Sequence, residues 1–232
     1  MDVLHELASG GAEAGTAVVA AEQTGGRGSR GRVWHSPPGG LWLSVLLRPE
    51  EEGPVELLAL RVGLAVARSL DEVGLSQPVL LKWPNDLMLG DRKVGGILCE
   101  ARWHGEVLGW ITVGLGLNVR NRVPAELEEI ATSLQGQVQG ITPESLIEPI
   151  VSQLRSLALA VGTLSPEELA ELRQRDWLWG RVVRQPIAGR ATGISAEGAL
   201  LVQCPDGSTV PLRAGTVELA ETPSTRNFDP CC

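Results

Sequence analysis

The sequence lacks any run of about 20 apolar residues, so it predicts no membrane-spanning helix. It also lacks a charged segment followed by a short apolar stretch at its start, which argues against a secretory signal peptide. The 232 residues carry a net charge of −8, whereas a dominant nucleic-acid groove requires a basic balance. Nucleic acid and membrane are therefore disfavoured as partners, and the composition (43% apolar, 21% charged) is typical of a folded globular chain.

Cysteine is also scarce. The four cysteines are Cys99, Cys204, Cys231 and Cys232, and none belongs to a C-x-x-C pair or lies near a cluster of histidines. This pattern argues against a zinc site. Scattered thiols without a disulfide framework fit a reducing, cytoplasmic location.

Lysine is rarer still, because only two of the 20 lysine and arginine residues are lysines, Lys82 and Lys93. Arginine presents a broad planar fork, while lysine is a compact point charge. One interpretation is a general bias toward arginine in the genome. The other is that a narrow site in this stretch of the chain requires an ammonium group.

The order of predicted elements changes near residue 176. Apolar spacing predicts helices over 2–9, 55–73, 143–161 and from Pro166 on, and strands over 17–22, 41–47, 79–83, 86–89, 93–102 and 107–119. Short strands then alternate with turns over 181–185, 188–194, 199–203, 209–212 and 217–219, which favours a small β-barrel. We expect a catalytic domain over residues 1–175, a barrel over 176–221 and a flexible tail over 222–232.

A glycine-rich loop follows the predicted strand 17–22. Residues 26–31 match the pattern G-x-G-x-x-G, after which a dinucleotide-binding fold would open a helix at once. Residues 32–40 contain two prolines and two glycines and cannot form that helix, and the sequence has no P-loop pattern. Because arginines alternate with the glycines, we expect either a surface loop or a lid that orders over an anionic ligand.

A second segment places polar groups at the end of a strand. Pro84 ends one predicted strand and directs Asn85 and Asp86 out of the sheet, where Asp86 can hold Mg²⁺ or a water. Lys93 begins the next strand, and the glycines at 95 and 96 leave room for a ligand against it. A plain hairpin with a solvated lysine is the alternative interpretation.

A third segment, residues 114–118, reads Gly-Leu-Gly-Leu-Asn. Its two alternate glycines clear one face of a strand, and Asn118 offers both a donor and an acceptor beyond them. A bend in a barrel-like strand would explain the same glycines.

Together, these segments resemble the signatures of biotin protein ligases, in order and at similar spacing. The matching segments are residues 23–34, 82–86, 92–98 and 114–118 and, nearer the C-terminus, Gly193, Gly198 and residues 215–217. The resemblance covers nearly the whole chain. It implies an α+β fold with a mixed β-sheet and helices packed on one side, similar to class II synthetase and biotin/lipoate ligase cores, followed by an SH3-like barrel.

The activity that the resemblance implies has two steps. Biotin and ATP give biotinyl-5′-AMP and pyrophosphate, and biotin then passes to one lysine of a biotin carboxyl carrier protein, an acetyl-CoA carboxylase subunit. ATP and Mg²⁺ would be required. Because no helix-turn-helix precedes the core, we expect a ligase without a DNA-binding domain and without repressor function, as a monomer or homodimer.

By position, the resemblance also assigns site residues. Catalysis would involve Lys93, Arg27 and Asp86, with Asp86 as the candidate metal ligand. The biotin-binding residues would be Gln23, Gly26, Arg27, Gly28, Ser29, Lys93, Gly96, Leu98, Gly114 and Gly116. The ATP-binding residues would be Arg30, Arg32, Trp34, Asn85, Asp86, Lys93 and Asn118.

Electrostatics supports the role of Lys93. A carboxylate must attack a phosphate, and at about 4 Å and an effective dielectric of about 20 the two anions repel by about 4 kcal/mol per charge pair. A fixed ammonium between them, together with Mg²⁺, reverses that sign, while a wider arginine fork would crowd the reacting groups. Asp86 is the candidate for taking a proton from the acceptor lysine.

Two departures from the family pattern are visible. Ser29 stands where many members carry arginine, so we expect weaker retention of the adenylate, because a serine cannot clamp an anion. The family's catalytic domain usually opens with a strand ending in Ser-Thr, and this sequence starts at Met1, about where that strand has ended. We therefore expect one strand and one pocket wall to be missing, through a start assigned too late or an impaired form.

Two alternatives stay open. One is a lipoate-type ligase, which shares the fold, although the complete Gly-Arg-Gly loop argues against it. The other is a non-catalytic protein that binds biotin or its carrier and has lost turnover through truncation.

Overall fold

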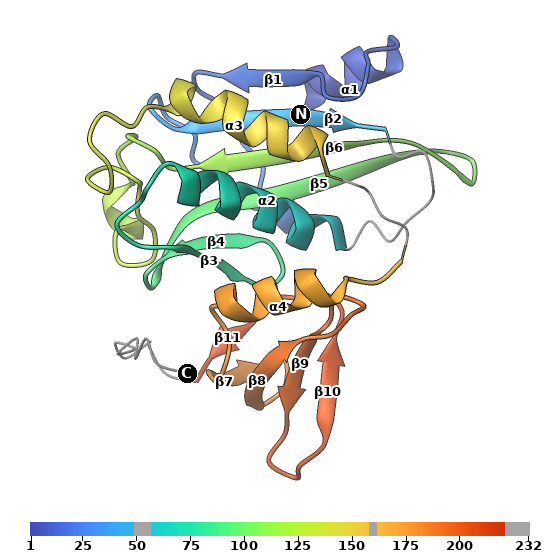
Figure 1. Ribbon diagram of the computed structural model, residues 1–232, viewed down its shortest axis with the longest axis vertical. Coiled ribbons are helices and arrows are strands. Elements are labelled where there is room, and N and C mark those ends of the chain that lie inside the picture. Colours follow the sequence, from blue (N-terminus) through green and yellow to red (C-terminus); the bar gives the residue numbers. More distant parts are fainter. Residues whose placement is uncertain (49–56, 158–161, 221–232) are drawn as a thin grey trace.

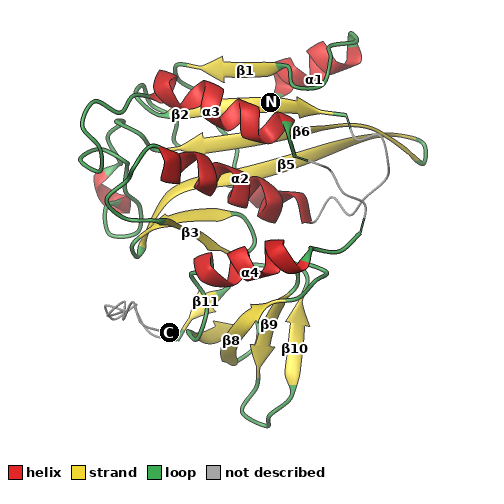
Figure 2. Ribbon diagram, viewed as in Figure 1, coloured by secondary structure: helices red, strands yellow, loops and turns green. Residues whose placement is uncertain are grey.

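The computed structural model describes residues 1–48, 57–157 and 162–220 (Figures 1 and 2). The helices are α1 (Asp2–Ser9), α2 (Leu58–Glu72), α3 (Pro143–Arg155) and α4 (Pro166–Arg175), with short 3-10 turns η1 (Ser29–Gly31) and η3 (Ala125–Leu127). The strands are β1 (Ala17–Ala20), β2 (Leu41–Leu47), β3 (Val79–Lys82), β4 (Asp86–Leu89), β5 (Arg92–His104), β6 (Val107–Leu117), β7 (Val182–Gln185), β8 (Gly189–Ile194), β9 (Leu200–Gln203), β10 (Thr209–Leu212) and β11 (Glu218–Leu219).

The predicted helices and strands are confirmed at these positions, with small differences at their ends. The first residues of the predicted helix 55–73, the last of the helix 143–161 and the predicted tail 222–232 lie outside the described residues. Among the described helices, none is long and apolar enough to cross a membrane.

Strands β1 to β6 form one sheet in the order β1-β2-β6-β5-β4-β3. Neighbouring strands in this sheet pair antiparallel. Within the described residues, parallel pairing occurs only as two isolated bridges, Leu81 with Asp176 and Lys93 with Ala131. The parallel part of the predicted mixed sheet is thus confined to points where loops attach to its strands.

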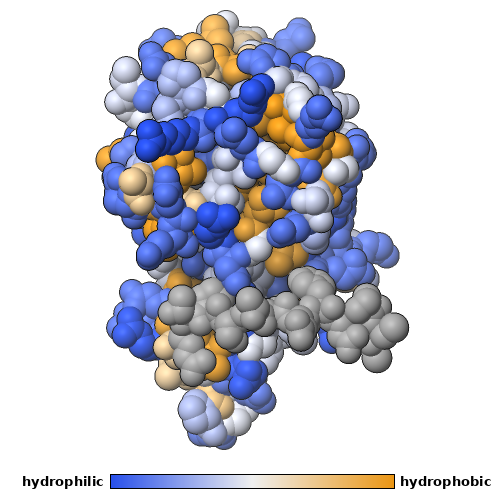
Figure 3. Space-filling model, turned by 90° about the vertical axis from the view of Figure 1, so that its left-hand side faces the viewer, coloured by the Kyte–Doolittle hydropathy of each residue, from blue (hydrophilic) through white to orange (hydrophobic). Residues whose placement is uncertain are grey.

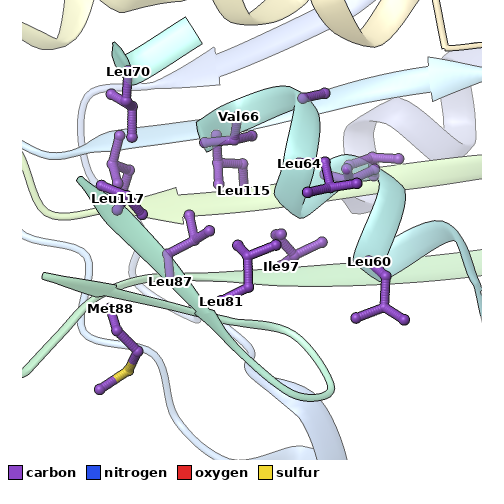
Figure 4. Close-up of a cluster of buried hydrophobic side chains, with 14 of the residues drawn as sticks. Leu60, Leu64, Val66, Leu70, Leu81, Leu87, Met88, Ile97, Leu115 and Leu117 are labelled. Atoms are coloured by element: carbon purple, nitrogen blue, oxygen red, sulfur yellow. The ribbon is translucent and has the colours of Figure 1, made fainter. Parts of the chain in front are cut away.

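Alternate residues of the sheet face α2 and α3 and form the main core. Leucines of α2 meet the sheet side chains directly (Figure 4). The participating strand residues are Leu81, Leu87, Ile97, Leu115 and Leu117, each at most 4% exposed. Since the intervening residues point away from α2, one face of the sheet carries the core and the other is free for a different use.

α1 packs against that other face. Its Leu4 and Ala8 form a separate buried cluster with Leu46 of β2 and Trp110 of β6, at positions that alternate with core residues such as Leu47. The prediction of helices on one side is therefore correct for α2 and α3 and wrong for α1. The apolar stripe of α1 is buried only because this end of the second sheet face is also apolar.

α4 begins with a capping box at Ser165. The Ser165 hydroxyl accepts from the Glu168 N–H at 3.2 Å, and the Glu168 carboxylate accepts from the Ser165 N–H at 2.8 Å. Glu168 also accepts from the buried Arg61 of α2 at 2.8 Å. Burial alone would raise the pKa of Glu168, but the hydrogen bonds from Arg61 and Ser165 and the charge of Arg61 lower it overall. This pair joins α4 to α2.

The C-terminal strands form a second antiparallel sheet in the order β10-β9-β8-β7-β11, and α4 lies between the two sheets (Figure 1). The Trp83 indole N–H, just after β3, donates to the Gly198 carbonyl at 2.9 Å. The Lys82 ammonium lies 5.2 Å from the centre of the Trp177 ring, and burial lowers its pKa. The predicted domain boundary at residue 175 stays a prediction, but these contacts bind the two sheets closely.

Candidate active site

A cavity of about 650 Å³ opens on the sheet face opposite α2 and α3. Its floor consists of alternate residues of β5 and β6, namely Gly96, Leu98, Gly114 and Gly116. Its walls come from the loop after β1 and the loop after β6. The chain leaves β1 and β6 at the left-hand end of Figure 1, and the space-filling view of that end shows apolar patches between strongly hydrophilic ones (Figure 3).

The structure brings the predicted site residues together, with one exception. The residues that line the cavity are Gln23, Gly26, Arg27, Gly28, Ser29, Arg32, Trp34, Asn85, Asp86, Lys93, Gly96, Leu98, Gly114, Gly116 and Asn118. Arg30 does not line it. With φ +61°, Arg30 turns toward the C-terminal sheet and donates to the Thr216 hydroxyl at 2.6 Å. The ligand-binding roles predicted for these residues, including Arg30, stay predictions.

The two central floor glycines face each other across β5 and β6 and are covered by Trp34. A Cβ on Gly116 would lie 2.5 Å from the Trp34 indole nitrogen, and a Cβ on Gly96 would lie 3.5 Å from the ring. Only glycine at position 116 therefore leaves room for the indole. The Trp34 Nε1 is buried with no hydrogen-bond partner among the described residues, so no hydrogen bond from the indole fixes the ring over the floor.

Lys93 stands at the edge of this floor. Its ammonium forms a short ion pair with Asp86 and lies 5.1 Å from the centre of the Trp34 ring. The backbone holds the residue in place, because the Lys93 N–H donates to the Ile130 carbonyl at 2.8 Å and its carbonyl accepts from the Thr132 N–H at 2.9 Å. A positive charge is thus fixed in the cavity with one counter-charge that a ligand can replace.

The two asparagines predicted to meet ATP use their side chains within the protein. Asn85 Nδ2 donates to the Ile97 carbonyl at 2.6 Å. Asn118 Nδ2 donates to the Thr132 carbonyl at 3.0 Å, and its Oδ1 accepts from Asn121 Nδ2 at 3.0 Å. In this structure both side chains therefore fix the backbone of the cavity walls.

The loop after β1 folds back as a short hairpin. The Gly28 N–H donates to the Arg32 carbonyl at 2.8 Å, and the Trp34 N–H donates to the Gly26 carbonyl at 2.9 Å. A Cβ on Gly26 would lie 2.3 Å from the Trp34 carbonyl oxygen, so this position requires glycine. The Ser29 hydroxyl accepts from Arg32 at 2.9 Å. The loop is therefore held as a hydrogen-bonded wall of the cavity.

Arg27 of this hairpin is held by acidic groups near α1. It donates to both Asp2 carboxylate oxygens at 2.8 and 2.6 Å, and Glu100 lies 4.0 Å away. This bonding lowers the pKa of Asp2 and raises that of Arg27. Glu100 in turn lies 2.8 Å from His5 Nε2, while His5 Nδ1 accepts from the Trp110 indole at 3.0 Å. A neutral His5 therefore carries its proton on Nε2 and donates to Glu100.

Sequence reasoning missed several residues of this site. Ser44 lines the cavity, and its signal was the lone polar side chain in the otherwise apolar strand Leu41–Leu47. Asp2 and Glu100 had no comparable signal, because α1 reaches the hairpin only through tertiary packing. Ile130, 64% exposed, lines the opposite wall from a loop for which no element was predicted.

The cavity offers few side chains that could coordinate a metal ion in the absence of a nucleotide. The described residues contain no group of three or more histidine, cysteine or acidic side chains that could hold one. Asp86 lines the cavity but is paired with Lys93. Mg²⁺ is commonly held by one or two carboxylates together with substrate phosphates and waters. The donor set therefore fits a magnesium ion that arrives with a phosphate ligand, and does not form a resident metal site.

The cavity thus combines a fixed ammonium, a glycine floor and an arginine-bearing hairpin over one sheet, an arrangement suited to an anionic ligand. A family model described as the Biotin/lipoate A/B protein ligase family matches residues 1–118, and one for the Biotin protein ligase C terminal domain matches residues 181–220. The chain belongs to the biotin protein ligase family.

Individual relatives support this family assignment. The bifunctional ligase/repressor BirA of Bacillus subtilis is 34% identical, over 88% of this chain and 66% of its own length. The biotin–[acetyl-CoA-carboxylase] ligase of Paracoccus denitrificans is 31% identical, over 83% of this chain and 86% of its own. The solved biotin protein ligase of Aquifex aeolicus in complex with biotin and ATP superposes with a TM-score of 0.77 at 28% identity, covering 93% of both chains. The chain thus spans just under two thirds of the Bacillus relative.

Proposed function

We propose that this chain is an ATP-dependent, AMP-forming biotin protein ligase. It would convert biotin and ATP to biotinyl-5′-AMP and pyrophosphate, and then transfer biotin to one lysine of a biotin carboxyl carrier protein of acetyl-CoA carboxylase. The observation that carries the proposal is the Lys93 ammonium at the edge of a glycine floor, beneath an arginine-bearing hairpin, in a chain of this family.

In the first step, a carboxylate oxygen of biotin attacks the α-phosphorus of ATP, and pyrophosphate leaves. Lys93 exchanges its Asp86 partner for the two reacting anions. At about 4 Å and an effective dielectric of about 20, its charge offsets a repulsion of about 4 kcal/mol. The backbone bonds on both sides of Lys93 keep the ammonium in position, so little reorganisation is needed when the anions meet.

In the second step, the carrier lysine attacks the mixed anhydride and AMP leaves. Asp86, freed from Lys93, is the group that accepts the proton of the incoming amine. The hairpin of residues 26–34 covers the cavity and limits hydrolysis of the intermediate. Mg²⁺ bound with ATP would neutralise phosphate charge, with Asp86 among its ligands.

Exchange of labelled pyrophosphate into ATP tests the first step, and transfer of biotin to a carrier domain tests the second. Exchange that requires biotin and does not proceed with lipoate is the expected result. Exchange with lipoate alone would make the chain a lipoate-type ligase. Biotin binding without exchange would leave a non-catalytic binding protein.

A further inference from the structure

The hairpin of residues 26–34 is joined to α1 by one ion pair. The two Nη atoms of Arg27 donate to the two carboxylate oxygens of Asp2, at 2.8 and 2.6 Å. Two parallel bonds of this kind fix the orientation of the guanidinium as well as its distance. Both residues line the cavity, Asp2 from α1 and Arg27 from the hairpin. The Asp2–Arg27 pair therefore connects two walls of the cavity across its opening.

The other two arginines of the hairpin make their hydrogen bonds elsewhere. Arg32 donates to the Ser29 hydroxyl at 2.9 Å, within the hairpin itself. Arg30 donates to the Thr216 hydroxyl at 2.6 Å, in the C-terminal part of the chain. Among the hydrogen-bonded arginines of the hairpin, Arg27 is therefore the one that contacts α1.

α1 has its own attachment to the sheet, which does not involve the hairpin. Leu4 and Ala8 are 0% and 2% exposed and pack against the second sheet face. At the C-terminal end of the helix, Arg48 of β2 donates to the Ala8 carbonyl at 2.6 Å and to the Ala12 carbonyl at 3.0 Å. These bonds satisfy carbonyls that the end of a helix leaves without partners. α1 is thus a fixed support from which Asp2 can hold the hairpin.

A second carboxylate supports the same guanidinium. Glu100 of β5 lies 4.0 Å from Arg27, and its other oxygen lies 2.8 Å from His5 Nε2. His5 follows Asp2 by three residues and therefore projects from the same side of α1. The His5 ring is fixed in turn, because its Nδ1 accepts from the Trp110 indole at 3.0 Å. α1 thus orients both acidic groups that surround the guanidinium.

From these contacts we infer that Asp2 is a positioning residue that holds the hairpin over the cavity through Arg27 and so slows the escape of biotinyl-AMP. The inference rests on the proposed function. The hairpin covers the cavity, so the intermediate leaves when the hairpin moves away from α1. The side chains of Arg27 and Asp2 are 47% and 69% exposed, which makes the pair a weak one in water. Its loss should therefore accelerate release by about threefold to fivefold.

The release of radiolabelled biotinyl-AMP from the full chain tests this inference. The adenylate is formed in place from biotin and labelled ATP, and its dissociation is followed after an excess of unlabelled biotin and ATP is added. Asp2→Ala is expected to release the adenylate about threefold to fivefold faster than the wild type. Glu6→Ala removes an acidic side chain from the same helix outside the cavity lining, so it serves as the matched control and should release at the wild-type rate.

A double variant separates positioning from a general effect on the helix. Asp2 lies in the first turn of α1, where a negative charge also stabilises the helix. If Asp2 acts through Arg27, Asp2→Ala should cause no further acceleration in a chain that already carries Arg27→Gln. If it acts through helix stability, Asp2→Ala should accelerate release by the same factor in both backgrounds.

Three results would overturn the inference. The first is release from Asp2→Ala at the wild-type rate, and the second is an equal acceleration with and without Arg27→Gln. The third is slower release from Asp2→Ala, which would show that Asp2 competes with the ligand for the Arg27 guanidinium. Thermal melts verify that each variant is folded. A wild-type chain that forms no adenylate would instead refute the proposed function itself.

Discussion

Replacing Lys93 by methionine removes the charge and keeps most of the side-chain volume. In the free protein, the variant loses the ion pair with Asp86 and the contact with the Trp34 ring. In the reacting complex, it leaves carboxylate and phosphate unscreened, at a cost of about 4 kcal/mol for charges about 4 Å apart in an effective dielectric of about 20. The rate of adenylate formation should therefore fall roughly a thousandfold.

Biotin-dependent pyrophosphate exchange measures this loss. Because Lys93→Met also leaves the Asp86 carboxylate without its partner, the double variant with Asp86→Asn separates the two effects. The loss should persist in the double variant. Lys82→Met is the matched control, since the other lysine lies over Trp177 and outside the cavity lining, and its loss should stay below about tenfold. Exchange by Lys93→Met within tenfold of the wild type would refute the proposed role of the ammonium.

Three further predictions concern other parts of the chain. Gly116→Ala forces the indole above it to move, whereas a Cβ on Gly96 makes ordinary contacts, so Gly116→Ala should weaken biotin binding about tenfold more than Gly96→Ala in the same titration. Ser29→Arg should slow the release of biotinyl-AMP in a filter assay, and equal release rates would defeat that expectation. Glu168→Gln should lower the free energy of unfolding, measured in urea at pH 7, by about 2–3 kcal/mol, because it removes the carboxylate that pairs with the buried Arg61. The folded state lowers the pKa of Glu168, so the wild type loses this stabilisation as the pH falls below the usual value of 4.5. The difference in free energy of unfolding between the wild type and Glu168→Gln should therefore disappear at low pH. A difference in free energy of unfolding that stays constant with pH would show that the carboxylate charge does not stabilise the fold.

Much of the fold could be predicted because local patterns decide it. The cap at Ser165 and the alternation along β5 and β6 are short-range signals, and tertiary packing did not override them. The position of α1 could not be predicted this way. Its apolar stripe is compatible with either sheet face, and only the cluster with Leu46 and Trp110 selects the second face.

The site likewise combines features that local sequence patterns predict with contacts that depend on tertiary packing. The motifs around Lys93 and Gly116 were each predicted from the sequence, and they meet because β5 pairs antiparallel with β6. The contacts of Arg27 with Asp2 and of Arg30 with Thr216 join residues far apart in sequence. The spacing of residues in the sequence does not indicate such contacts. The partners that orient these two arginines can therefore be identified only from the structure.

Alternate residues of β5 and β6 face the core and the cavity, so substitutions at neighbouring positions are expected to have different effects. Ile97 and Leu115 face α2, where truncation to alanine typically costs about 2–5 kcal/mol of stability. Their neighbours Gly96 and Gly116 face the cavity, where an added methyl acts first on Trp34 and Lys93. Folding and ligand binding therefore depend on alternate residues of the same two strands. A shift of the β5–β6 register by one residue would exchange the two sets, placing leucines in the cavity and glycines in the core, so the glycine pattern also acts as a constraint on the pairing that builds the sheet.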